Sequence, residues 1–140
     1  QEVIDLFELR EGLEGVSAFL AAQRVTVENL GKMKESIGMR LGDIKQLERE
    51  FYYPPDIDFH KMVVESSGNV RLMECLMSIY DQLLTLRISS ASQKGRAKES
   101  AEEHMEIYKM LEGGSPEGAE KAMRIHIRNA KENILLHYPF

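Results

Sequence analysis

Three histidines stand among apolar residues at helical spacing, so each could present an imidazole to the inside of the protein. His60 follows Asp56 by four residues in DIDFH, which would place both side chains on one face of a helix. His104 lies in ESAEEHMEIYKML and His126 in EGAEKAMRIHIRNA, where mostly apolar or small side chains share the face of each histidine. The pattern indicates three helices that each turn a histidine inward.

Three neutral imidazoles and one carboxylate are a suitable ligand set for a divalent transition metal. Nitrogen donors suit Zn, Ni, Cu or Fe, and a carboxylate offsets part of the charge. A metal would satisfy all four groups at once, whereas three buried core histidines would each need a separate partner. We therefore predict a metal site formed by Asp56, His60, His104 and His126, with Zn or Ni as the ion.

Two other interpretations of the same residues stay open. A mononuclear metalloenzyme would use an open coordination position to activate water, and a structural helical interaction domain would use the histidines as core residues. The sequence has no HExxH or CxxC motif. Glu103 is a conceivable general base, but beside Glu102 it is interpreted as a solvated acid. His137, near the end of the sequence, is interpreted as a surface or dimer-contact residue.

Polar residues near the histidines indicate what such a site would bind. Arg10 lies on the inward face of a predicted helix, where a guanidinium could hold a carboxylate with two hydrogen bonds. The alternative for Arg10 is a salt bridge to Glu14, one turn further along. Ser100 and Asn129 are each one turn from one of the two later histidines, so we expect them to orient the rest of a ligand. The predicted ligand is a small mono- or dicarboxylic acid.

Apolar residues recur at helical spacing along the chain, and no stretch alternates as a strand would. The pattern predicts an all-α protein, an antiparallel bundle of six to seven helices around a central cavity for metal and ligand. Helices are expected over residues 3 to 23, Thr26 to Gly42, a short segment from Asp43, Asp56 to Gly68, Val70 to Leu86, Arg96 to Leu111, and Pro116 to Leu136.

Composition places the chain among compact cytoplasmic proteins. With 140 residues and 43% apolar side chains, it is expected to form one domain. It has neither the roughly 18 continuous apolar residues of a membrane-spanning helix nor a signal peptide. Cys75 is its one cysteine and is expected to be a buried, inert thiol. Since the first residue is Gln, we expect the chain to be a fragment or to have been trimmed.

The order of the motifs ELREGLEG, DIDFH followed by SSGN, EEH and AMRIHIRNA resembles the C-terminal effector-sensing domain of FadR-type GntR transcription regulators, the FCD domain. The resemblance covers nearly the whole chain and includes the 22-residue step from His104 to His126. It implies an antiparallel helical bundle in which Asp56, His60 and the two later histidines hold a metal. The chain departs from the family in LGDIKQLEREFYYPPD, so Asp58 stays a rival to Asp56 as ligand.

The resemblance also implies a function: a sensing domain that is not an enzyme. A small organic acid would enter the bundle, complete the coordination of the metal and alter the geometry of a homodimer, with the helices containing Leu13 and Leu76 as contact surfaces. The winged-helix DNA-binding domain that family members carry before this one is absent from the chain. A net charge of −5 agrees with DNA contact only through that other domain.

Overall fold

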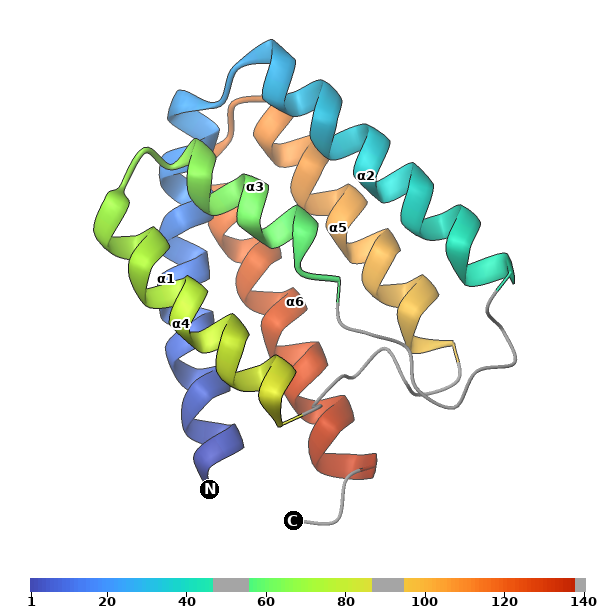
Figure 1. Cartoon of the computed structure of the whole chain (residues 1–140). Helices are drawn as coiled ribbons and strands as arrows, with labels where there is room; N and C mark the ends of the chain where they lie inside the picture. The colour runs from blue at the N-terminus through green and yellow to red at the C-terminus, as the bar shows by residue number, and fades with distance from the viewer. Residues whose placement is uncertain (47–55, 87–94, 138–140) are drawn as a thin grey trace.

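The computed structural model describes residues 1–46, 56–86 and 95–137 (Figure 1). These residues form six helices, and no strand occurs among them. The helices are α1 Glu2–Arg24, α2 Val27–Gln46, α3 Asp58–Ser66, α4 Val70–Thr85, α5 Arg96–Glu112 and α6 Pro116–His137. The predicted all-α bundle of six to seven helices is confirmed. Within the described ranges, no helix is both long and apolar enough to cross a membrane.

Helix α1 packs against four of the other helices. It contacts α3, α4, α5 and α6, and it runs antiparallel to α6 (Figure 1). Helix α2 packs along α5, while α3 contacts α1, α2 and α4. A cluster of buried apolar side chains joins all six helices. Because α1 supplies one wall for α3, α5 and α6 together, side chains from these three helices can meet beside it.

Capping residues define where the helices turn back. Thr26 Oγ1 accepts a hydrogen bond from the backbone N–H of Asn29 at 3.1 Å, and Ser115 Oγ accepts one from Gly118 at 3.2 Å. Gly68, between α3 and α4, has a φ of 67°, the left-handed conformation that favours glycine. Thr26 and Ser115 thus cap the starts of α2 and α6, and Gly68 follows Ser67, the C-cap of α3.

The helix boundaries around Gly42 differ from the prediction. Helix α2 continues through Gly42 and Asp43 to Gln46, so no separate helix begins near Asp43. Gly42 has a negative φ like the rest of α2, and a Cβ there would have open space around it. Its cost inside a helix, about 1 kcal/mol relative to alanine, is too small to end one by itself. The following segment, with its two prolines, lies outside the described residues, and α3 begins at Asp58 rather than Asp56.

One prediction about α4, the burial of Cys75, is wrong. Cys75 is exposed, because the buried stripe of α4 passes through Leu76 and leaves the neighbouring position outside it. Leu76 is fully buried in the core, so it cannot itself contact a second chain. Leu13 is partly buried against the same core. The exposed large apolar residues of α1 and α4 are instead Leu9, Val16, Val70 and Leu84. The dimer surface stays a prediction.

Candidate metal centre

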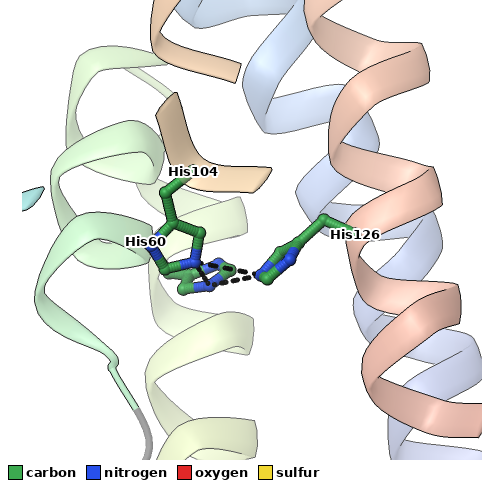
Figure 2. Close-up of side chains that lie close together, drawn as sticks. All are labelled: His60, His104 and His126. Atoms are coloured by element: carbon green, nitrogen blue, oxygen red, sulfur yellow. Dashed lines mark hydrogen bonds between the residues drawn. The ribbon is translucent and has the colours of Figure 1, made fainter. Parts of the chain in front are cut away.

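Three buried histidines converge in the core from three helices. His60 comes from α3, His104 from α5 and His126 from α6 (Figure 2). Their Nε2 atoms are separated by 3.0 Å for His104 and His126, 3.1 Å for His60 and His104, and 3.2 Å for His126 and His60. The structure therefore brings together the three histidines that the sequence singles out.

The other ring nitrogen of two of these histidines faces a glutamate. Nδ1 of His60 contacts Oε1 of Glu14, and Nδ1 of His126 lies 2.7 Å from Oε1 of Glu103. A carboxylate in this position requires a proton on Nδ1, because an ionised carboxylate only accepts hydrogen bonds. In a neutral ring, Nε2 then carries a lone pair directed away from the glutamate. Both rings thus present lone pairs to the centre of the cluster.

Three lone-pair-bearing nitrogens this close together cannot all be joined by hydrogen bonds. His60 and His126 have no proton on Nε2 when both are neutral and donate through Nδ1, and His104 can offer at most one. The three short contacts among them therefore include at least one between facing lone pairs. A cation between the rings would accept all three lone pairs. The donor set fits a metal better than it fits a hydrogen-bonded core.

The charge states of the site also suit metal binding. Burial lowers the pKa of His104 to about 4 and the pKa of His126 to about 3, so both rings are neutral near pH 7. Burial would raise the pKa of Glu103, but hydrogen bonds from His126 and Arg96 hold it at about 2. Burial would likewise raise the pKa of Glu14, yet Arg10 and His60 keep that pKa well below its usual value. Neutral imidazole is the form that binds a metal.

The spacing of the donor atoms fits a single ion. Imidazole nitrogens bound to zinc lie ~2.1 Å from it, and two such nitrogens are about 3.0–3.4 Å apart when their angle at the metal is between a right angle and the tetrahedral value. The observed separations of 3.0 to 3.2 Å fall in that range. The separations of the three nitrogens are therefore compatible with binding to one ion.

Asp56 lies beside the histidines and not among their converging nitrogens. Its Oδ2 is 3.5 Å from Nδ1 of His104 and 3.9 Å from Nε of Arg40. Asp56 and the exposed Asp58 both line a groove of about 730 Å³, whose other residues come mostly from α2 and α3. Neither aspartate belongs to the group of donor atoms formed by the three histidines within the described residues. Coordination by Asp56, or by its rival, stays a prediction.

The three predicted ligand-binding residues differ in their contacts. Arg10 donates through Nε to Glu14 at 2.7 Å, which is the salt bridge noted as the alternative. Asn129 donates through Nδ2 to Glu103 at 2.9 Å, and Ser100 is partly buried one turn before the histidine of α5. Their contact with an organic acid stays a prediction.

Sequence reasoning gave the wrong environment to Glu103. It is not a solvated acid, because it accepts two hydrogen bonds from the buried Arg96, at 2.6 and 3.0 Å, besides those from His126 and Asn129. The seven-residue spacing of Arg96 and Glu103 places them on one helix face and was an available signal.

The sequence predicts for Glu14 only a salt bridge to Arg10. It is in fact 1% exposed and also accepts a hydrogen bond from the hydroxyl of Tyr80 at 2.8 Å. Its position four residues before Ala18, on the most buried face of α1, was the signal for this environment.

Comparison with known proteins identifies related sequences over most of the chain. The model of the family described as the FCD domain matches residues 5–129. The chain is 31% identical to the "HTH-type transcriptional regulator LutR" of Bacillus subtilis (strain 168), over 99% of this chain and 64% of that protein. It is 25% identical to the "HTH-type transcriptional repressor NanR" of Klebsiella aerogenes, over 87% of this chain and 47% of that protein.

Two further matches agree with these. The chain is 23% identical to the "Putative L-lactate dehydrogenase operon regulatory protein" of Escherichia coli (strain K12), over 88% of this chain and 48% of that protein. The solved structure "Streptococcus agalactiae GntR" superposes with a TM-score of 0.69 at 31% identity, over 89% of this chain and 55% of that one. The chain spans about half to two thirds of the length of these relatives. Their names are those of transcription regulators and not of enzymes, in agreement with the expectation from sequence.

Proposed function

The chain belongs to the FCD domain family, and we propose that it is the effector-sensing domain of a GntR-type transcription regulator, in which a divalent metal takes part in binding a small organic acid. The observation that supports a metal is the convergence of three Nε2 atoms within 3.2 Å of one another. At the same time, the Nδ1 atoms of His60 and His126 face carboxylates. That arrangement leaves the centre rich in lone pairs.

The proposed ligands are His60, His104, His126 and, as the fourth, Asp56. Zn or Ni is the proposed ion, because imidazole nitrogens with a single carboxylate suit both. Asp56 is proposed because it lies beside His104, with 3.5 Å between its Oδ2 and the ring's Nδ1. A bound ion would supply a positive charge and an open coordination position for a carboxylate oxygen.

The proposed effector is a small mono- or dicarboxylic acid. Arg10 supplies positive charge near the site, with a side chain that is 11% exposed and a guanidinium lying over the rings of Phe7 and Tyr80. One relative bears the name of a putative regulator of an L-lactate dehydrogenase operon, which makes a hydroxycarboxylate a reasonable first probe. Ser100 and Asn129 are proposed to orient the rest of the effector.

DNA binding is proposed to belong to another domain of the full-length protein. Two relatives are named as HTH-type regulators, and this chain corresponds to 64% or less of their length. The chain's net charge of −5 does not favour contact with phosphates. We therefore assign DNA contact to a helix-turn-helix domain of the full-length protein, with a homodimer of the present domain transmitting the effector signal.

Elemental analysis and calorimetry test this function. Protein purified without chelator should carry about one divalent metal per chain, and a His104→Ala, His126→Ala variant should lose it. Titration with L-lactate and a panel of other organic acids should show binding that weakens strongly when the metal is removed. Arg10→Ala should weaken it further, by about 1.5–3 kcal/mol, typical of a lost charged hydrogen bond. Arg128→Ala, which removes an exposed arginine paired with Glu11, is the matched control.

Two results would contradict this proposal. Absence of metal from protein prepared without chelator would remove the basis of the proposal. Binding of an organic acid that is indifferent both to metal removal and to Arg10→Ala would place the effector elsewhere.

A further inference from the structure

Two of the metal-site histidines are each held by a series of contacts that links three residues: an arginine, a glutamate and the histidine. In the first, Arg10 donates to Glu14 at 2.7 Å and Glu14 contacts Nδ1 of His60. In the second, Arg96 donates twice to Glu103, which lies 2.7 Å from Nδ1 of His126.

Each glutamate also has a neutral donor. Tyr80 donates its hydroxyl proton to Glu14 at 2.8 Å, and Asn129 donates to Glu103 at 2.9 Å. The two series of contacts connect different helices: the first joins α1 to α3, and the second joins α5 to α6. The same arrangement has thus been built twice around one centre.

The helical packing alone does not require a carboxylate at these positions. Glu14 is 1% exposed, and burying an ionised group is costly unless it is fully paired. In the second series the buried charged group is Arg96, at 4% exposure, which pairs with Glu103. Apolar residues would fill the same space without the desolvation cost. A role that needs negative charge behind each ring explains why these positions are ionic.

We propose that Glu14 and Glu103 are positioning residues of the metal centre, each keeping the proton of its histidine on Nδ1 so that the Nε2 lone pair points to the metal. A carboxylate behind a metal-binding imidazole also raises the basicity of the ring, and loss of such a partner typically weakens metal affinity about 10–100-fold. The inference rests on the proposed function only in that the histidines bind a metal. The arginines keep the glutamates ionised and in place.

His104 lacks an equivalent support of the same quality. Its Nδ1 has no hydrogen-bond partner within the described residues, and the nearby Asp56 is at 3.5 Å. The two glutamates therefore carry the orientation of two of the three rings, while Phe59 stacks on the third, with ring centroids 4.5 Å apart.

The test compares Glu14→Gln and Glu103→Gln with the wild type, using Zn²⁺ and Co²⁺ alone as probes in competition with a chromophoric chelator. Glutamine keeps the shape and removes the charge. Each variant should bind the metal about 10–100-fold more weakly. Glu120→Gln, which alters a partly exposed glutamate paired with Arg124 on the surface, should leave metal affinity unchanged. Glu103 is 23% exposed, so its variant keeps the test available even if the buried Glu14→Gln protein does not fold.

A second readout does not depend on bound metal. Long-range ¹H–¹⁵N spectra of metal-free protein should show His126 with its proton on Nδ1, and Glu103→Gln should shift the ring toward the Nε2–H tautomer. A purely structural role of the glutamate would leave this tautomer balance unchanged. Tight metal binding by wild type and by both variants alike would overturn the inference and leave the proposed function intact. A wild-type protein that binds no metal would overturn the proposed function, and the tautomer measurement would still decide whether Glu103 fixes the ring.

Discussion

The imidazole of His104 stacks on the ring of Phe59, with centroids 4.5 Å apart and an angle of 18° between the planes. Phe59 is the residue before His60 on α3 and is completely buried. The contact joins α3 to α5 between two residues that are 45 positions apart in the sequence.

Phe59→Leu should weaken metal binding while keeping the fold. Leucine fills part of the space but offers no flat surface to hold the imidazole plane. Metal affinity should fall severalfold, and the free energy of unfolding should fall by about 1–3 kcal/mol, within the range for core substitutions. Chelator competition and urea denaturation measure the two effects. Phe7→Leu removes a buried ring on α1 next to Arg10 and shows the effect of a general loss of packing. Equal metal affinities for both variants and wild type would show that stacking does not orient His104.

Metal-free protein should lose stability as the pH falls below about 6.5. The pKa of His104 is about 4 and that of His126 about 3 in the folded protein, against 6.5 in an unfolded chain. Between these values the unfolded state binds more protons, so the free energy of unfolding decreases as the pH decreases. Glu103, whose pKa is lowered from 4.5 to about 2, continues the same trend at lower pH. Urea denaturation of metal-free protein from pH 7.5 to 4.5 measures the slope.

The control for the pH effect is a His104→Asn, His126→Asn variant. Its stability should vary much less between pH 7 and 5, because the two buried rings that resist protonation are gone. Constant wild-type stability across that interval would contradict the depressed pKa values of these histidines.

The histidine cluster was predictable from sequence, whereas the contacts of Glu14 and Glu103 with histidines of other helices were not. Each of His60, His104 and His126 interrupts a helical stripe of mostly apolar or small side chains, which is a local and visible signal. Glu103 follows another glutamate, so charge patterning alone assigns it to solvent. The contact between Glu14 and His60 spans 46 positions and depends on how α1 packs against α3, which no local pattern contains.

Two glycines of α1 should respond in different ways to alanine substitution. A Cβ at Gly12 would have nothing within 4 Å, so Gly12→Ala should raise the free energy of unfolding by up to about 1 kcal/mol through helix propensity. A Cβ at Gly15 would lie 2.8 Å from Nε and 3.0 Å from Cγ of Arg124 on α6. Gly15→Ala must displace that side chain from its ion pair with Glu120, so its gain should be smaller or reversed. Urea denaturation compares them, and equal gains would show that Arg124 moves freely.

The domain should form a dimer through exposed apolar residues of α1 or α4. Leu9 and Val16 are seven positions apart on α1 and are 53% and 42% exposed, which makes a short apolar strip. A Leu9→Glu, Val16→Glu variant should shift the protein toward monomer in sedimentation velocity at micromolar concentration. Val70→Glu tests α4 in the same way. A wild type that sediments as a strict monomer would count against dimerisation by this domain, and a dimer unaffected by either variant would place the contact elsewhere.

Metal and effector should strengthen each other's binding, with Glu14 as part of the connection. Arg10, the proposed contact for the effector, and His60, the proposed metal ligand, share this one carboxylate. An anion that draws the guanidinium toward itself would leave more negative charge on the side facing His60, which makes the ring a stronger donor. By linkage, the factor by which the metal tightens effector binding must equal the factor by which the effector tightens metal binding.

Two calorimetric titrations measure this factor, one with effector into metal-free and metal-loaded protein and one with metal into effector-free and effector-bound protein. They require an acid that binds the metal-loaded protein. Glu14→Gln should reduce the factor, since the charge shared by the two sites is removed, whereas direct attraction between anion and ion keeps it above one. Glu103→Gln is the matched control. It should weaken the metal through His126, and any change in the factor would then run through Asn129, which donates to Glu103, rather than through Arg10. Glu120→Gln, at a partly exposed glutamate paired with Arg124, should leave both the metal affinity and the factor unchanged. If Glu14→Gln retains the full wild-type factor, the two sites communicate through the metal alone, and Glu14 has no part in the coupling.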